Sequence, residues 1–167
     1  FTKDLIEIKK FFKKHKKIII KPIHSYGGND INLISGKLNL LKIKQILKKH
    51  GHIMCQKFLN KIKFGDKRVF IINGKVCGAI SRVPKSGSIL SNMSKGAKPK
   101  IAFLSNKELK VSNIIAKKIK KDGIYFAGID FIDGKLNGDI NVTSPTGIKT
   151  YFDLSQINLA KTFWKGL

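Results

Sequence analysis

Carboxylate side chains are scarce in this sequence, and the spacing of a few polar residues suggests metal binding. Asp130 interrupts an apolar segment, and Asp139 and Asn141 alternate in the following segment, which places both on one face of a strand. If the two segments form a hairpin, Asp130 joins them. Carboxylate and amide oxygens suit a Mg²⁺ ion that also binds phosphates. A turn-flanking Asp beside a solvent-exposed Asn remains the alternative, because these residue types are not distinctive.

Two further groups of residues could bind phosphate. Gly27 and Gly28 follow an apolar strand that ends near Lys21, and glycine amides with a lysine can cradle phosphate oxygens. A Gly-Gly pair is, however, more often only a turn. Arg68 and Arg82 are the sole arginines of the chain, and an arginine pair can stabilise the charge on a transferred phosphoryl group. Surface cations on a very basic protein are the alternative interpretation.

Basic residues dominate the composition and raise the question of nucleic-acid binding. The 167 residues include 34 Lys or Arg and 10 Asp or Glu, for a formal net charge of +24. Electrostatics alone would permit nucleic-acid binding. The lysines occur in every segment, however, and proteins that read base sequence favour arginine for bidentate contacts. We therefore favour drift in an A+T-rich genome as the origin of the lysines, and expect no nucleic-acid partner.

Length and cysteine usage indicate about one domain in a reducing compartment. A length of 167 residues is close to the soft prior of about 150 residues per domain, and the 42% apolar fraction is enough to form a core. No apolar run approaches the ~18 residues that a membrane span needs. Cys55 and Cys77 fit no zinc or CxxC pattern, so reduced thiols in a cytoplasmic protein are expected. The chain starts at Phe1 without an initiator Met, which indicates a piece of a longer protein.

The elements that would position these residues are mixed, which predicts an α+β fold. Thr2 is a candidate N-cap for the first helix, Asn73-Gly74 is a strong hairpin signal, and Ser105 with Glu108 fits a capping box. The segment 84–100 is rich in Ser, Gly and Lys and is predicted to be a long loop. Helices are expected at 3–15, 40–49, after 105 and at 156–164, and strands at 18–20, 31–34, 52–58, 66–72, 75–83, 125–132 and 139–142.

Taken together, these segments resemble the ATP-grasp half of bacterial glutathione synthetase. The most specific segment runs from Asp139 to Thr146, where a metal-ligand strand leads into Val-Thr-Ser-Pro-Thr. The other matching segments come in the family's order and at nearly its spacing over almost the whole chain. They are 19–22 with Gly27-Gly28, 56–59, 65–69, 82–84 and 128–130.

The resemblance implies an ATP-grasp fold and an ATP-dependent carboxylate–amine ligase. Residues 1–57 would be part of the central subdomain, and 58–167 the C-terminal subdomain with a mobile loop at 84–100. The family joins γ-glutamylcysteine to glycine: ATP phosphorylates the carboxylate, and the amine then attacks the acyl phosphate, with ADP and phosphate released. The resemblance also implies Mg²⁺ or Mn²⁺ as the metal, a cytoplasmic location, a homo-oligomeric full-length protein and no membrane partner.

Each site residue takes a role from this resemblance alone. Arg68 and Arg82 would bind the transferred phosphoryl group and the acyl phosphate. Asp130, Asp139 and Asn141 would hold the metal. The nucleotide would contact Lys21, Gly27, Gly28, Gln56, Lys57, Phe58, Leu59 and Asp66, and the substrate would border Ser144, Pro145 and Thr146.

This chain departs in three ways from the pattern of the family that it resembles. Asp139 stands where the family normally has Glu, and the segment 86–96 contains only two glycines. The family's N-terminal domain and the start of its central domain are absent, so this chain alone is expected to bind ATP weakly or to be inactive. A ligase that adds glutamate to a protein tail and a non-enzymatic nucleic-acid-binding protein remain the alternatives.

Overall fold

The computed structural model describes residues 1–24 and 28–166 and divides the chain into two compact units. The units are Phe1–Asn60 and Lys61–Leu167, and each is described by itself. Within the described residues, no helix combines the length and the apolar character that a membrane span requires. The assignment of 1–57 and 58–167 to particular ATP-grasp subdomains stays a prediction.

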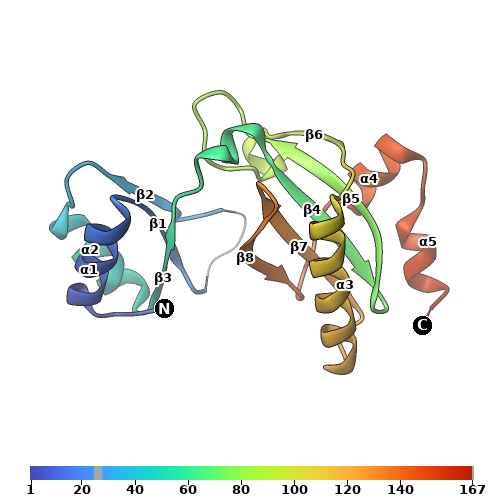
Figure 1. The fold of residues 1–167 in the computed structure, drawn as a ribbon, viewed down its shortest axis with the longest axis horizontal. Helices are drawn as coiled ribbons and strands as arrows, with labels where there is room; N and C mark the ends of the chain where they lie inside the picture. The colour runs from blue at the N-terminus through green and yellow to red at the C-terminus, as the bar shows by residue number, and fades with distance from the viewer. Residues whose placement is uncertain (25–27, 167) are drawn as a thin grey trace. The chain divides into compact units, whose positions relative to one another are not determined.

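The unit Phe1–Asn60 consists of a three-stranded antiparallel sheet and two helices (Figure 1). The strand order is β2-β1-β3. Isoleucines of the strands pack with Ile8 and Phe12 of the first helix and Ile43 and Ile46 of the second, which closes a core on one face of the sheet. The elements are α1 (Leu5–His15), β1 (Lys17–Pro22), β2 (Asn32–Ser35), α2 (Leu40–His50) and β3 (Ile53–Lys57).

The first helix starts later than its sequence pattern predicts. Asp4, not Thr2, is the N-cap of α1, and its carboxylate accepts a hydrogen bond from the amide of Ile6 at 2.7 Å. Thr2 instead pairs with Ile53 through two backbone hydrogen bonds of 3.0 Å, so the chain is extended at this point. A side chain that accepts a hydrogen bond from a free amide of the first turn fixes where the helix begins, and Asp is as good an N-cap as Thr.

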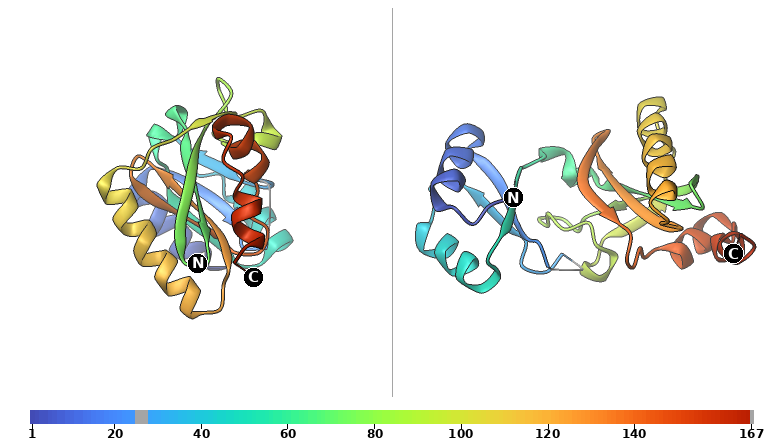
Figure 2. Two further views of the ribbon diagram at one scale, coloured as in Figure 1. Left: turned by 90° about the vertical axis from the view of Figure 1, so that its right-hand side faces the viewer. Right: turned by 90° about the horizontal axis from the view of Figure 1, so that it is seen from below.

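The unit Lys61–Leu167 is built on a five-stranded antiparallel sheet with the order β6-β5-β4-β7-β8. One helix, α3, lies along one side of this sheet, and α4 and α5 lie on the other side (Figure 2). The strands are β4 (Asp66–Ile72), β5 (Lys75–Val83), β6 (Lys98–Ile101), β7 (Phe126–Ile132) and β8 (Lys135–Asn141). The helices are α3 (Asn106–Lys121), α4 (Ile148–Ser155) and α5 (Leu159–Trp164), with short 3₁₀ turns at Asn60–Phe64 and Met93–Lys95.

The hairpin of β4 and β5 has the predicted turn. Asn73 and Gly74 both have positive φ, 49° and 72°, which is the two-residue turn that matches the twist of the flanking strands. The turn therefore sets which residues of β4 and β5 face each other. A register shift between Phe70 and Ile71 adjusts the pairing, and Asp66 then lies opposite Arg82.

Alternation along β4 divides its side chains between two cores. Val69 and Ile71 face α3 and pack with Ala116 and Ile119. Phe70 and Ile72 face the other way and pack with residues of α4 and α5, including Tyr151. Asp66 and Arg68 continue the second set by the period of two, so the charged side chains share a sheet face with the aromatic core.

The C-terminal part of the chain differs from the sequence-based expectation in two places. The predicted loop 84–100 contains the short turn Met93–Lys95 and most of strand β6, which pairs with the end of β5. The helix expected at 156–164 is present but begins later, as α5 at Leu159 with Asn158 as its N-cap. Helix α4, which ends at Ser155, was not expected, and Gln156, with φ 61°, separates the two helices. A residue in the left-handed region interrupts the helical hydrogen bonds, so the pattern resumes in a new direction.

Candidate functional site

Four buried charged side chains form a network on the sheet face of the second unit. Arg82 donates from Nε to Oδ1 of Asp66 at 2.8 Å and from Nη2 to Oδ2 at 2.5 Å. The same Nη2 lies 3.0 Å from Oδ2 of Asp130. Arg68 binds both oxygens of Asp130, through Nε and, at 2.8 Å, through Nη2. Two cations thus alternate with two carboxylates, and two of the contacts are bidentate, the strongest arrangement of an arginine and a carboxylate.

The strand register brings these residues together. Asp66 faces Arg82 across the β4–β5 pair, and Arg68 faces Asp130 across the β4–β7 pair. Asp66 and Arg68 are two residues apart, so both point to the same face. The predicted site residues therefore come from three neighbouring strands, and their distances along the chain do not matter once the sheet forms.

Glycine at position 128 makes room for the Arg68 side chain. A Cβ at Gly128 would lie 2.9 Å from Cδ of Arg68 and 3.1 Å from Cβ of Pro145. Arg68 therefore passes directly over the backbone of β7 on its way to Asp130, and Pro145 approaches the same point. Gly65 has a similar role, because a Cβ there would meet the carbonyl oxygen of Arg82 at 2.8 Å, and its φ of 103° is unfavourable for other residues.

The four charged side chains are buried, so each depends on the others for its charge partners. Each of the four side chains is no more than 7% exposed. Burial raises the pKa of Asp66 in spite of its hydrogen bonds from Arg82, and the nearby charge of Asp130 adds to the effect. Burial acts to lower the pKa of Arg82, but its bonds to Asp66 and the charge of Asp130 outweigh this and raise it. Arg82 thus stays charged, and removing either partner would leave a buried ion unpaired.

Ser91 joins the network from the segment between β5 and β6. Its hydroxyl donates to Oδ2 of Asp66 at 2.5 Å, the same oxygen that accepts from Nη2 of Arg82. Sequence reasoning missed this residue. The segment carries four serines, and nothing in their order distinguishes Ser91 from the others.

On the opposite face of the same strand, Lys67 ties β4 to the start of α3. Its ammonium binds Oε2 of Glu108 at 2.7 Å, and Glu108 also accepts from the amide and hydroxyl of Ser105 in the predicted capping box. Burial acts to raise the pKa of Glu108, but the hydrogen bonds from Lys67 and Ser105 outweigh it and lower the pKa. Lys67 lies between Asp66 and Arg68 in sequence, so its contact with Glu108 holds the strand that carries them.

The three predicted metal ligands have different surroundings. Asp130 is buried and bound by both arginines, whereas Asp139 is exposed on β8. Asn141 faces Gly128 in the register, and its side-chain oxygen accepts from the amides of Thr143 and Ser144 at 3.2 and 3.1 Å. Asn141 thus forms an Asx turn. Two carboxylates and an amide oxygen remain a donor set that fits Mg²⁺.

The predicted substrate-bordering residues follow this turn. The carbonyl oxygen of Ser144 accepts a hydrogen bond from the side-chain amide of Asn141 at 3.2 Å, and Pro145 packs near Gly128. The carbonyl of Thr146 accepts from Nη1 of Arg68 at 3.3 Å. The segment 144–146 therefore lies against the charged network, and Arg68 connects the two.

In the first unit, the predicted nucleotide residues fall on one sheet face and at its end. Lys21 and Gln56 belong to the set that alternates with the core isoleucines of β1 and β3, since Ile19 pairs with Gln56 and Lys21 pairs with Met54. Phe58 lies under the ammonium of Lys17, 4.2 Å from ring centroid to nitrogen. Lys57 is the last residue of β3, and Leu59, two residues later, is half-buried. Gly28 has φ 77°, and Gly27 lies outside the described residues.

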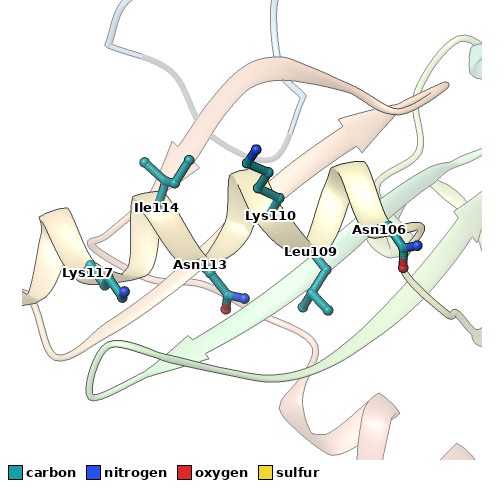
Figure 3. Close-up of a pocket in the computed structure, with 6 residues that line it drawn as sticks. All are labelled: Asn106, Leu109, Lys110, Asn113, Ile114 and Lys117. Atoms are coloured by element: carbon teal, nitrogen blue, oxygen red, sulfur yellow. The ribbon is translucent and has the colours of Figure 1, made fainter.

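A surface pocket lies elsewhere, on the outer side of α3 (Figure 3). Its lining in the described part of the chain comes from six residues of that helix, and no predicted site residue is among them. Because α3 packs on the face of Val69 and Ile71, the pocket and the charged network are on opposite sides of the sheet. The lining residues are Asn106, Leu109, Lys110, Asn113, Ile114 and Lys117.

Comparison with known protein families assigns the chain to a family. The family model for the ATP-grasp domain of prokaryotic glutathione synthetase matches residues 1–156. The chain belongs to the prokaryotic glutathione synthetase family. The resemblance noted in its sequence motifs is thereby confirmed, and the match includes the first compact unit and the second as far as residue 156.

Curated relatives agree with this assignment. The glutathione synthetase of Bradyrhizobium diazoefficiens is 33% identical over 98% of this chain and 52% of its own length. That of Buchnera aphidicola is 37% identical over 88% of this chain and 47% of its own length. The chain thus spans about half the length of the curated relatives it matches.

Solved structures show the fold. The ATP-grasp ligase PsnB, in a complex with a variant of its minimal precursor, Mg and ADP, has a TM-score of 0.66 at 17% identity, covering 99% of this chain and 50% of that one. The D-alanine–D-alanine ligase of Bacillus anthracis complexed with ATP has a TM-score of 0.64 at 14% identity, covering 97% and 55%. The fold is therefore the ATP-grasp fold, as its motifs predict.

Proposed function

We propose that this chain is the ATP-binding part of a ligase that joins γ-glutamylcysteine to glycine, with ADP and phosphate as the other products. The observation that carries the proposal is the buried network of Asp66, Arg68, Arg82 and Asp130 in a member of the glutathione synthetase family. A carboxylate is a poor electrophile, and phosphorylation converts it into an acyl phosphate with a good leaving group.

The two arginines are the groups that would meet transferred phosphate. Guanidinium groups bind phosphate oxygens as they bind carboxylates, through two parallel hydrogen bonds. Arg68 and Arg82 are at present neutralised by two aspartates, so a phosphate must compete with those carboxylates for the guanidinium groups. We assign to this exchange the stabilisation of the charge on the transferred phosphoryl group. Ser144, Pro145 and Thr146 would border the substrate beside Arg68.

Asp130, Asp139 and Asn141 are the residues that would hold the metal. Their oxygens match the preference of Mg²⁺ for hard donors, and Mn²⁺ accepts the same donor types. Bound Mg²⁺ would neutralise phosphate charge. Asp130 can serve a metal only with a rearrangement of its arginine contacts, because both of its oxygens accept from guanidinium groups. The arginines would then turn toward the phosphate.

Nucleotide-binding roles are assigned to this chain residue by residue. We assign Lys21 and the turn at Gly28 to the phosphates, and the backbone of Lys57 and Leu59 to adenine, with Gln56 and Phe58 beside them. Asp66 would accept hydrogen bonds from the ribose hydroxyls. These roles rest on the family's motifs at the same positions of this sequence.

A thermal-shift titration with Mg-ATP tests the proposal most directly. A ligand that binds only the native state raises the melting temperature. We expect Mg-ATP to stabilise the protein more than Mg²⁺ alone, and we expect Asp130→Asn to remove that stabilisation. Asp133→Asn is the matched control, because Asp133 lies at the next turn, is exposed and pairs with Lys61.

The substrates are tested by phosphate release. Phosphate release from ATP that requires both γ-glutamylcysteine and glycine would support the ligase. The assay is run on this chain alone and on this chain mixed with the remaining half of a curated relative. A shift with single-stranded RNA and none with Mg-ATP would contradict the proposal and favour the nucleic-acid alternative. Equal Mg-ATP shifts in the wild type and Asp130→Asn would contradict the metal assignment.

A further inference from the structure

The hydroxyl of Ser91 occupies a place at Asp66 that a ligand would need. Oδ2 of Asp66 accepts from Ser91 at 2.5 Å and from Nη2 of Arg82 at 2.5 Å. A carboxylate oxygen offers about two lone-pair positions, so Oδ2 is saturated. Oδ1 accepts from Nε of Arg82 at 2.8 Å and has one position left among the described contacts. A ligand with two adjacent hydroxyl groups therefore finds one acceptor position, not two.

Of the two donors at Oδ2, Ser91 is the one that can leave. Arg82 is held by both oxygens of Asp66 and by Asp130, and it is 5% exposed. Ser91 is half-buried, and its bond to Asp66 is a single contact between neutral and charged partners. If a ligand displaced Arg82 from Oδ2, buried charges would be left unpaired. If it displaced Ser91, one hydroxyl donor would take the place of another.

The chain around Ser91 forms a closed loop through the site. The segment leaves the sheet directly after Arg82 and Val83 and returns to Asp66, the partner of Arg82, at Ser91. Its tip is exposed: Lys85 and Gly87 face solvent, and a Cβ at Gly87 would meet nothing within 4 Å. Beyond Ser91, Met93 packs against the aromatic core and holds the end of the segment. Ser91 is therefore positioned to connect the exposed tip with Asp66.

We propose that Ser91 is a positioning residue for Asp66: its hydroxyl holds segment 84–92 on the carboxylate, and a ribose hydroxyl of a bound nucleotide takes its place at Oδ2. The inference rests on the proposed function, since it requires a nucleotide at Asp66. Nucleotide binding and release of the segment are then linked, because each Ser91 bond broken is replaced by a ribose bond. By the same linkage, removing the Ser91 hydroxyl makes nucleotide binding tighter.

Isothermal titration with Mg-ADP and with Mg-2′,3′-dideoxy-ADP tests the exchange. Ser91→Ala is expected to lower the Kd for ADP by about three- to tenfold, the range that a net hydrogen bond supports. It is expected to leave the Kd for the dideoxy nucleotide unchanged, because that ligand has no hydroxyl to place at Oδ2. Ser91→Thr keeps the hydroxyl and is expected to behave as wild type. Ser94→Ala, an exposed serine of the same segment, is the matched control.

Trypsin cleavage after Lys85 gives a second readout that does not depend on affinity. Without nucleotide, Ser91→Ala is expected to be cleaved about tenfold faster than wild type, because the segment has lost its tie to Asp66. Mg-ADP is expected to raise the wild-type rate toward that of the variant, and the dideoxy nucleotide is not. A purely structural role for Ser91 would change the first rate but would not make the second depend on the ribose hydroxyls.

The outcomes separate this inference from the proposed function. If the wild type binds ADP but Ser91→Ala binds it no more tightly, or if the dideoxy nucleotide shows the same gain, the exchange at Oδ2 is wrong and the proposed function stands. If no variant binds ADP, both are wrong. Tighter ADP binding in Ser91→Ala alone, with the ribose-dependent change in cleavage, would establish the role of Ser91.

Discussion

Arg82 binds Asp66 through both carboxylate oxygens, at 2.8 and 2.5 Å, although neither side chain is more than 5% exposed. The two residues are 16 positions apart in sequence and directly opposite in the β4–β5 register. Because Nη2 of Arg82 also lies 3.0 Å from Asp130, this pair links the residue proposed for ribose to the residue proposed for metal. A change at any one of the three is therefore expected to alter the other two.

Arg82→Met is expected to destabilise the protein by about 3–5 kcal/mol, because it leaves the buried Asp66 carboxylate without its main partner. Urea unfolding measures the loss. Adding Asp66→Asn removes the stranded charge, so the double variant is expected to lose less than the sum of the two single variants. Lys85→Met replaces an exposed cation of the same region and is expected to change stability by less than about 0.5 kcal/mol. Equal losses for Arg82→Met and Lys85→Met would contradict the buried pair.

Gly128→Ala is expected to cost about 1–3 kcal/mol, because the new Cβ would lie 2.9 Å from Cδ of Arg68 and 3.1 Å from Cβ of Pro145. The free energy of unfolding, measured with and without Arg68→Ala in the background, identifies the cause. Since two of the three close atoms belong to Arg68, the cost is expected to shrink in that background. An unchanged cost there would mean that the backbone, not Arg68, excludes a side chain at 128.

Asn141→Ala is expected to lower the free energy of unfolding by about 0.5–1.5 kcal/mol even without metal or nucleotide, since it removes the acceptor for the amides of Thr143 and Ser144. Asn141→Asp keeps that acceptor and is expected to retain most of the stability. Thermal unfolding of the three proteins in EDTA measures this turn alone. The Mg-ATP shift of Asn141→Asp then reports on metal binding, because the turn is intact. Identical stability of the Ala variant and wild type in EDTA would rule out the structural role.

The contribution of Glu108 to stability is expected to depend on pH in a defined direction. The pKa of Glu108 is lowered in the folded protein, so the ionised carboxylate stabilises the fold above its ordinary pKa of about 4.5, and this contribution is lost as the pH falls through the folded value. The difference in unfolding free energy between wild type and Glu108→Gln should therefore be large at about pH 7 and shrink in acid. Glu7→Gln, on the exposed side of α1, is the control. A difference that grows in acid would reverse the sign.

Features that depend on neighbouring residues were predictable from sequence. The turn at Asn73-Gly74 needs two residues that tolerate positive φ, and the capping box of Ser105 and Glu108 spans four residues. Both appear as predicted, and strands β4 and β5 have the predicted bounds. Such motifs form from contacts a few residues apart, so the sequence pattern contains nearly all of their energetics.

Elements with weak local signals were predicted less well. Strand β6 contains Lys, Pro and a second Lys and gains its order from pairing with β5, which a local pattern does not reveal. Helix α4 was missed: Tyr151 packs against Phe70, with ring centroids 5.7 Å apart, and such a distant contact has no local signature. The break between α4 and α5 comes from the left-handed backbone conformation of Gln156, and a glutamine in the sequence does not predict that conformation.

The sequence by itself determined the family, the ATP-grasp fold and the identities of the residues that could perform chemistry, because these depend on motifs in order along the chain. Tertiary structure decided which of those residues meet. Arg68 reaches Asp130 across 62 positions of sequence, over a glycine that leaves it room, and Ser91 reaches Asp66 from a segment with no distinguishing pattern. Buried ion pairs are chosen by strand register and by the cost of an unpaired charge, and both exist only once the sheet has formed.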